Sequence, residues 1–165
     1  PVKNHEFLID IFASVVKKHQ DSVLLLVGTG SEEEKIREKV SGLGLSKKVI
    51  FAGRRTDVEK IMSAADAFVL PSHFEGLPLV LVEAQSSGLN CFVSDAVPEE
   101  AKLLDNFEFI PLDIGAEAWA DRILSAALNT DRASASAVVA AAGYDCKLTA
   151  ARIEEIYSQQ IALCL

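Results

Sequence analysis

The chain has 165 residues, half of them apolar, and a formal net charge of -8 at pH 7, so it can bury the core of one domain. The negative charge argues against general binding to nucleic acid, because a polyanion is repelled unless basic side chains gather on one face. No stretch approaches the ~18 consecutive apolar residues of a membrane span and no charged-then-apolar leader opens the sequence, so we expect a soluble domain.

The number and spacing of the cysteines indicate the redox environment of the protein and whether a zinc site is expected. The three cysteines, Cys91, Cys146 and Cys164, lie far apart and show neither the CxxC or His spacing of a zinc site nor the even number of a disulfide framework. This pattern favours a reduced, cytoplasmic protein. The chain opens on proline and enters an amphipathic pattern almost at once, so we expect it to be part of a longer protein.

The first quarter of the chain predicts a helix, a strand and a second helix. Apolar residues recur at helical spacing over residues 4–20. The apolar run at residues 23–27, closed by a Gly-Thr-Gly turn, predicts a strand buried on both faces. Ser31 and Glu34 have the spacing of a capping box, which predicts a helix over residues 31–42.

The middle of the chain repeats this alternation. Short apolar runs predict three further strands, at residues 49–52, 67–70 and 91–93. Thr56 and Glu59 repeat the capping-box spacing before a third helix. A fourth helix is predicted over residues 77–87, with a proline in its first turn.

The last third is rich in predicted helix. It contains one more strand, at residues 107–112, and three helices, at residues 116–128, 133–142 and 146–163. Apolar strands that alternate with helices of similar length predict an α/β fold with a Rossmann-like, doubly wound parallel sheet covered on both faces. We expect residues 1–165 to form one domain without internal repeats.

In open sheets of this kind, ligands bind at the carboxyl ends of the strands. Four predicted strand ends carry glycine, hydroxyl or charged residues, namely Gly28-Thr29-Gly30, Gly53-Arg54-Arg55, residues 71–76 and Ser94-Asp95. Together they would form a rim suited to a phosphorylated ligand.

The loop at residues 71–76 carries the most specific pattern. It leads through Gly76, Leu77 and Pro78 directly into a helix, so the amides of Gly76, Leu77 and Leu79 should point toward an anion. Proline near a helix start loses no hydrogen bond. A phosphate could dock at this helix start.

The charged residues near this rim have structural as well as functional interpretations. Glu83 lies among apolar residues, so we expect it to be buried and to need a partner, namely the two hydroxyls of a ribose or a structural ion pair. The alternative is a position on the rim of the helix. Glu75 could simply favour a helix dipole, Arg54 could be an ordinary exposed cation, and Lys3 a solvated residue.

Several common nucleotide motifs are absent. The third glycine of a dinucleotide fingerprint is replaced by Glu33, which disfavours a nicotinamide cofactor. The phosphate-loop pattern and an Asp-x-Asp metal motif are missing as well. We therefore expect no metal and no other cofactor, and a bound diphosphate would be neutralised by cations and helix amides.

These features resemble the carboxyl-terminal domain of GT-B glycosyltransferases of family 4, especially the retaining enzymes that build capsular and cell-surface polysaccharides. Their E-x7-E signature matches Glu75 and Glu83, with serine ahead, Glu-Gly-Leu-Pro at the turn and Gly88 after the helix. Lys3 matches the family's diphosphate-binding lysine. The arginine that precedes this lysine in the family would lie before residue 1, and Asn90 replaces a common proline.

The resemblance implies roles for these residues. Glu83 would hold the donor ribose, while Glu75 and the amides near Gly76 and Leu77 would contact the transferred sugar and the diphosphate. Lys3 would stabilise the departing nucleotide diphosphate. The donor-binding set is completed by the loop residues and helix start, namely Gly30, Arg54, Pro78 and Leu79. In the family, the sugar keeps its anomeric configuration, with the leaving phosphate assisting deprotonation of the acceptor.

The resemblance implies a donor-binding half of a glycosyltransferase that uses a nucleotide sugar. A glycan or lipid-linked acceptor would bind through a separate amino-terminal domain, and peripheral association of the full-length protein with a membrane stays open. We expect the isolated chain to bind nucleotide weakly and to be inactive. Two alternatives remain, a nucleotide-sugar 2-epimerase of the same architecture and a non-catalytic nucleotide-sugar-binding module.

Overall fold

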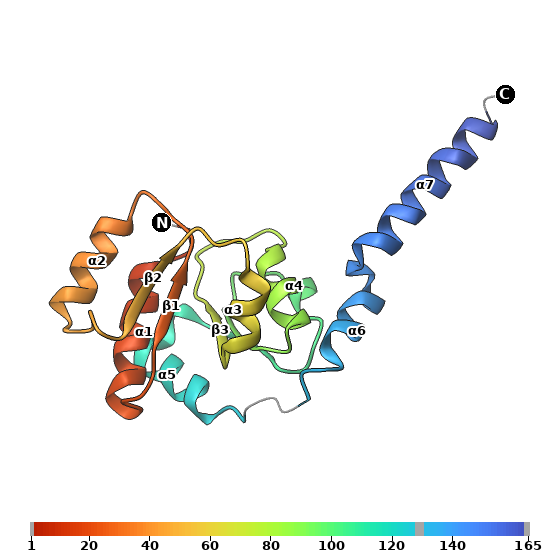
Figure 1. Cartoon of the computed structure of the whole chain (residues 1–165). Coiled ribbons are helices and arrows are strands. Elements are labelled where there is room, and N and C mark those ends of the chain that lie inside the picture. The colour runs from red at the N-terminus through yellow and green to blue at the C-terminus, as the bar shows by residue number, and fades with distance from the viewer. Residues whose placement is uncertain (1, 128–130, 164–165) are drawn as a thin grey trace.

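The computed structural model describes residues 2–127 and 131–163 and shows an α/β fold (Figure 1). Its strands are β1 (Leu24–Val27), β2 (Val49–Gly53), β3 (Ala67–Leu70), β4 (Asn90–Ser94) and β5 (Phe107–Ile110). Its helices are α1 (His5–Lys18), α2 (Glu33–Gly42), α3 (Val58–Ala64), α4 (Leu79–Ser86), α5 (Gly115–Ser125), α6 (Ala135–Val139) and α7 (Cys146–Leu163). The predicted strands and helices are all present, and most ends agree within two residues.

Helices α1 and α5 form one side of the main core. The apolar stripe of α1 is buried through Ile9, Ile11 and Phe12, as its helical spacing requires. Trp119 of α5 is fully buried, and its indole N–H donates to the carbonyl of Pro111 at 2.9 Å, so its one polar group is satisfied. These two helices therefore cover one face of the sheets.

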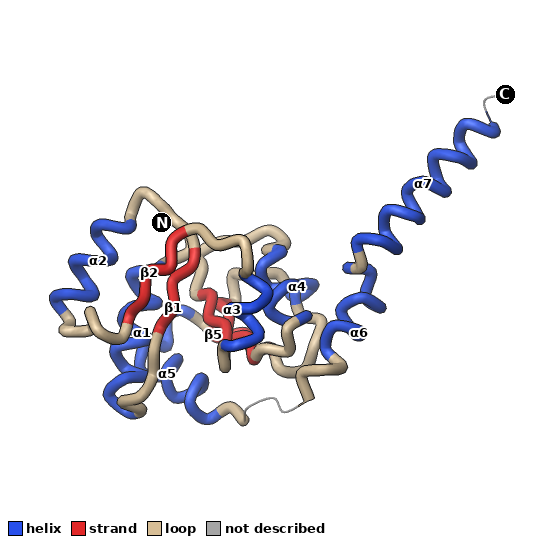
Figure 2. The backbone as a smooth tube through the Cα atoms, in the orientation of Figure 1, coloured by secondary structure: helices blue, strands red, loops and turns tan. Residues whose placement is uncertain are grey.

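All strand pairs are parallel, as predicted, but the sheet is not continuous. Strand β1 pairs with β2, and β3 pairs with β4, which pairs with β5. The described strands thus form a two-stranded and a three-stranded parallel sheet, and Figure 2 shows them as two groups. Leu24 of β1 and Val69 of β3 nevertheless pack against the same core, so the two sheets share one domain interior.

Strand β1 packs against the core on one face only and is exposed on the other, which corrects the prediction that both faces are buried. Leu24 and Leu26 point into the core, whereas Leu25 and Val27 are 38% and 42% exposed and Ile50 of β2 is 51% exposed. The reason is the placement of the helices. The second core cluster contains Met62 of α3, Leu81 of α4 and buried residues of β3, β4 and β5, so α3 and α4 cover the other sheet instead.

The two predicted capping boxes do not form. Helix α2 begins after Glu32 and α3 after Asp57, and neither start has a side-chain cap. The backbone amide of Glu33 donates to the carbonyl of Gly30 at 3.2 Å. The Arg55 guanidinium donates to both carboxylate oxygens of Asp57, at 2.9 and 2.7 Å. Other local contacts therefore take the place of the predicted capping boxes.

The other differences lie in the second half of the chain. Strand β5 ends at Ile110 because Pro111 follows and a short 3-10 turn (Leu112–Ile114) takes over. The predicted helix at residues 133–142 is α6 followed by one π turn (Ala140–Tyr144), broken at Gly143 with φ 98°. Residue 128, the last of another predicted helix, lies outside the described residues.

Helix α7 extends away from the rest of the chain (Figure 1). Its apolar side chains stay largely exposed, with Leu148 67% and Ile161 63% exposed. Among the described residues, no helix is both long enough and apolar enough to cross a membrane.

The thiol of Cys91 should be inert in the folded protein. Burial raises the pKa of Cys91 to about 12, so the reactive thiolate is scarce at neutral pH. We expect iodoacetamide at pH 7.5 to alkylate the exposed Cys146 and to spare Cys91 until urea unfolds the chain. Peptide mass spectrometry measures both sites, and comparable native labelling rates would contradict this burial.

Candidate functional site

The first two loops of the predicted rim are joined. The amide of Gly28 donates to the carbonyl of Gly53 at 2.8 Å, and both residues have positive φ, at 117° and 64°, which favours glycine. Arg54 is exposed and has no ion-pair or hydrogen-bond partner among the described residues. Arg55 is held by Asp57 instead, so Arg54 is the available cation of this loop.

The start of the chain lies against the loop that follows β3. The amide of His73 donates to the carbonyl of Val2 at 2.8 Å. The hydroxyl of Ser94, at the end of β4, donates to the carbonyl of Ser72 at 2.5 Å. Both serine side chains are fully buried. These contacts confirm that widely separated segments meet at the carboxyl ends of the strands.

Lys3 and Glu75, 72 positions apart, form an ion pair at the centre of this region. The Lys3 Nζ atom donates to Glu75 Oε1 at 2.9 Å, and the Ser72 hydroxyl donates to the same oxygen at 2.7 Å. The Glu75 side chain is 12% exposed and that of Lys3 is 48% exposed. Within the described residues, Glu75 Oε2 accepts no hydrogen bond, so one carboxylate oxygen is fixed and the other is available.

The predicted anion site at the start of α4 has open amides. Helix α4 begins at Leu79, directly after the buried Pro78. In the described part of the chain, the amides of Gly76, Leu77 and Leu79 donate to no acceptor. Leu77 and Leu79 are 45% and 65% exposed, so a ligand can approach these amides from solvent.

Glu83 is exposed, which corrects the prediction that it is buried. The buried polar side chain of α4 is Gln85, whose amide nitrogen donates to the carbonyls of Leu81 and Ala101 at 3.0 and 2.8 Å. Its oxygen accepts from the amide of Leu103 at 2.8 Å. Helix α4 therefore buries one face and exposes the other. The apolar residues next to Glu83 in the sequence do not mean that the whole helix is buried.

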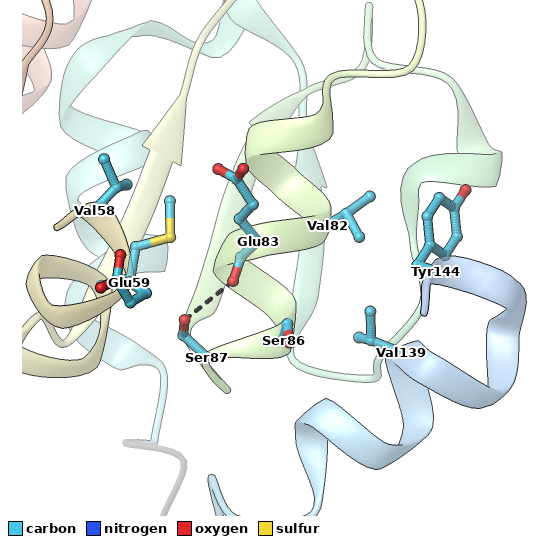
Figure 3. Close-up of a pocket in the computed structure, with 9 residues that line it drawn as sticks. Val58, Glu59, Val82, Glu83, Ser86, Ser87, Val139 and Tyr144 are labelled. Atoms are coloured by element: carbon cyan, nitrogen blue, oxygen red, sulfur yellow. Dashed lines mark hydrogen bonds between the residues drawn. The ribbon is translucent and has the colours of Figure 1, made fainter. Parts of the chain in front are cut away.

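Glu83 lines a pocket of about 300 Å³ (Figure 3). The pocket is formed by α3, α4 and the segment around α6, through Val58, Glu59, Met62, Val82, Glu83, Ser86, Ser87, Val139 and Tyr144. Figure 3 shows the Glu83 carboxylate on the side of α4 that faces α3. Glu75 does not line this pocket. The two acidic residues of the motif therefore have different surroundings, an ion pair for Glu75 and an open pocket for Glu83.

Arg132 is a residue of this region that the sequence patterns did not single out. Its guanidinium donates to the carbonyls of Met62, Ala65 and Ser87, each at 2.9 Å, and so joins the carboxyl ends of α3 and α4. A Cβ atom on Gly88 would lie 2.8 Å from the Cα atom of Arg132, so only glycine fits beside it. These contacts set the spacing of the two helices that flank the pocket.

The cations and metal-binding groups near the site are few. Burial lowers the pKa of His5, so this side chain is neutral at pH 7 and Lys3 carries the positive charge at the start of α1. Among the described residues, no three His, Cys, Asp or Glu side chains are grouped so that they could hold a metal ion.

The family of group 1 glycosyl transferases matches residues 1–141. The chain belongs to the group 1 glycosyl transferases. The putative glycosyltransferase EpsF of Bacillus subtilis is 33% identical over 160 residues, which are 95% of this chain and 42% of that protein. This group 1 glycosyl transferase chain therefore spans less than half the length of that relative.

A second relative covers a smaller part of the chain. The Escherichia coli UDP-Gal:alpha-D-GlcNAc-diphosphoundecaprenol alpha-1,3-galactosyltransferase is 36% identical over 98 residues, 58% of this chain and 25% of that protein. Both relatives carry names of glycosyltransferases.

Solved structures confirm the Rossmann-like fold of this group 1 glycosyl transferase. The pneumococcal O-GlcNAc transferase GtfA, in complex with UDP and GlcNAc, superposes with a TM-score of 0.81 at 20% identity, covering 95% of this chain and 33% of that one. Anabaena Alr3699/HepE, in complex with UDP and glucose, gives 0.77 at 23% identity, covering 96% and 45%. At these identities the likeness concerns the fold.

The contacts of Arg132 predict a large effect on stability. Arg132→Ala removes three charge-assisted hydrogen bonds and should lower the free energy of unfolding by about 2–4 kcal/mol. Arg122→Ala is the matched control, because its exposed pair with Glu108 at 2.7 Å should contribute about 0–1 kcal/mol. Urea denaturation followed by circular dichroism measures both variants, and equal losses would contradict the special role of Arg132.

Proposed function

We propose that this chain is the donor-binding domain of a retaining glycosyltransferase. The full-length enzyme would transfer a sugar from a nucleotide diphosphate sugar to a glycan or lipid-linked acceptor in the synthesis of a surface polysaccharide. The observation that carries this proposal is the Lys3–Glu75 pair at 2.9 Å beside the open amides before and at the start of α4. The E. coli relative named above uses UDP-Gal, and the two structural neighbours hold UDP, which supports a nucleotide sugar as donor.

The diphosphate would bind at the amino-terminal end of α4. The amides of Gly76, Leu77 and Leu79 offer hydrogen bonds and the positive end of the helix dipole. Lys3 is half exposed, so its ammonium group can contact a phosphate while it stays close to Glu75. In this proposal these groups neutralise the diphosphate and no metal ion or other cofactor is required.

The nucleoside would lie toward the pocket of Glu83. The pocket is lined by two carboxylates and by no cation, so it favours a neutral ribose over a phosphate. The exposed carboxylate of Glu83 can accept hydrogen bonds from both ribose hydroxyls. The Arg54 backbone and Gly30 stand at the neighbouring strand ends, where a base would be contacted.

Glu75 would act on the transferred sugar. Its Oε1 atom is fixed by Lys3 and Ser72, while Oε2 can accept a hydrogen bond from a sugar hydroxyl or stabilise positive charge on the sugar. Lys3 would stabilise the negative charge that develops on the leaving diphosphate. Retention of the anomeric configuration follows from the family resemblance.

The acceptor would bind to a part of the enzyme outside this chain. The chain spans 42% of the B. subtilis relative, so an amino-terminal acceptor domain would supply the other wall of the cleft. In this proposal the isolated chain binds nucleotide weakly and completes no transfer. A cytoplasmic enzyme that associates peripherally with a membrane would reach a lipid-linked acceptor.

Glu75→Gln should reduce turnover of the full-length enzyme by about 10²-fold, because it removes one positioned stabiliser of transition-state charge. Glu117→Gln is the control, since this glutamate is exposed on α5. Release of UDP, GDP or ADP from the matching nucleotide sugars in the presence of acceptor measures turnover. Near-normal kinetics of Glu75→Gln in a folded enzyme would remove its catalytic role.

Glu83→Ala should weaken nucleotide binding by roughly 10-fold, the effect of about 1.4 kcal/mol of lost hydrogen bonding to a charged group. Glu59→Ala, on the α3 wall of the same pocket, is the control and should bind nucleotide at least as well as the unchanged chain. Calorimetric titrations with UDP, GDP and ADP in EDTA measure affinity and the need for metal. Unchanged affinity of Glu83→Ala would exclude the ribose contact, and loss of binding in EDTA would exclude the metal-free site.

A further inference from the structure

Two buried serine side chains connect the central strand of the three-stranded sheet to Glu75. Strand β4 pairs with β3 on one edge and with β5 on the other, and all five of its residues are buried. Ser94 is its last residue, and its hydroxyl donates to the carbonyl of Ser72 at 2.5 Å. The hydroxyl of Ser72 in turn donates to Glu75 Oε1 at 2.7 Å. Because a hydroxyl carries one proton, each serine spends its only donor on this connection.

The two hydrogen bonds to Glu75 Oε1 come from side chains of different mobility. Lys3 has a flexible four-carbon stem and is 48% exposed, so solvent weakens its ion pair. The Ser72 side chain is short and fully buried. Pro71, directly before it, is also fully buried and restricts the backbone there. Ser72 therefore fixes the Glu75 carboxylate more firmly than Lys3 does.

This difference matters once a diphosphate binds. In the proposed function, on which this inference rests, the Lys3 ammonium group contacts a phosphate of the donor. A diphosphate carries more negative charge than one carboxylate, so it attracts Lys3 more strongly than Glu75 does. The hydrogen bond from Ser72 does not involve the ligand and stays in place. Glu75 can then keep one position while the sugar reacts, as a stabiliser of transition-state charge must.

We propose that Ser72 is a positioning residue for glycosyl transfer and that Ser94 supports it from the end of β4. Ser72 holds the Glu75 carboxylate when Lys3 turns to the leaving diphosphate. The lysine is then available for the diphosphate and the carboxylate for the sugar. Both serine side chains are fully buried, so they act through Glu75 and not by contact with the donor.

Nuclear magnetic resonance of the chain tests the geometric part. Three-bond couplings from Glu75 Cγ to the backbone nitrogen and carbonyl carbon show whether the side chain keeps one χ1 rotamer. We expect one rotamer in the unchanged chain and in Lys3→Met, and averaging between rotamers when Lys3→Met is combined with Ser72→Ala. Averaging in Lys3→Met alone, or one rotamer in the double variant, would overturn the proposal.

The matched control for these couplings combines Lys3→Met with Ser14→Ala. The Ser14 hydroxyl donates to the carbonyl of Asp10 within α1, at 3.2 Å, so its loss removes a serine hydrogen bond away from the site. Glu75 should keep one rotamer in this variant.

Kinetics of the full-length enzyme test the catalytic part, with nucleotide release from the matching nucleotide sugar as the readout. Ser72→Ala should lower kcat by about 10-fold or more and change KM for the donor by less than about twofold, because the contacts that hold the donor remain. In a Glu75→Ala background, Ser72→Ala should lower kcat by less than about twofold, since its effect passes through Glu75. Ser14→Ala should leave both constants unchanged.

Ser94→Ala tests the support from β4. This variant should lower kcat in the same direction, and it should add less than about twofold to the effect of Ser72→Ala. Circular dichroism checks that each variant is folded. If Ser94→Ala does not fold, the cycle of Ser72→Ala with Glu75→Ala still decides the role of Ser72.

The outcomes separate this inference from the proposed function. If Glu75→Ala abolishes turnover and Ser72→Ala does not change it, the positioning role is wrong and the proposed function stands. If Ser72→Ala lowers kcat by the same factor with and without Glu75, its role is only structural and the inference fails. Normal turnover of Glu75→Ala would instead remove the role of Glu75 in the proposed function.

Discussion

The candidate site depends on the attachment of the first residues to the loop that follows β3. Two contacts make this attachment, the hydrogen bond from the His73 amide to the Val2 carbonyl and the ion pair of Lys3 with Glu75. Within the loop, the Ser72 hydroxyl holds the same carboxylate. These contacts place a cation next to open helix amides. An anion that reaches this point meets hydrogen-bond donors from the Lys3 ammonium group and from the helix amides, although the whole chain carries a net charge of -8.

Negative charge is distributed in a way that gives a ligand one orientation. Glu59 and Glu83 line the pocket between α3 and α4, where a phosphate would be repelled. Glu75 is neutralised by Lys3, so it does not repel an anion at the start of α4. A molecule with an anionic part and a neutral, hydroxyl-bearing part can satisfy both regions at once. A nucleotide sugar has this composition.

Local sequence patterns predicted the order of strands and helices well, because each element carries its own apolar periodicity. They failed where a distant residue decides the outcome. Glu83 is exposed because the covering of α4 depends on other helices. Arg132 lies 45 to 70 positions from the carbonyls that it binds, and no local pattern marks it. Lys3 and Glu75 were found through a family resemblance, since a lone lysine near a chain start carries no structural signal.

Helix α4 is fixed at three points, so a ligand needs to reorganise little of the site. Its start follows a loop held by Ser72 and Ser94, its buried face is held by Gln85, and its end is held by Arg132. The open amides are therefore positioned before any ligand arrives, and little backbone ordering remains to be done on binding. The Lys3 side chain is the exposed and adjustable part of the site. Lys3 is already paired with Glu75, so a diphosphate can bind its ammonium group without first desolvating an isolated charge. The Glu75 carboxylate stays in place to contact the sugar.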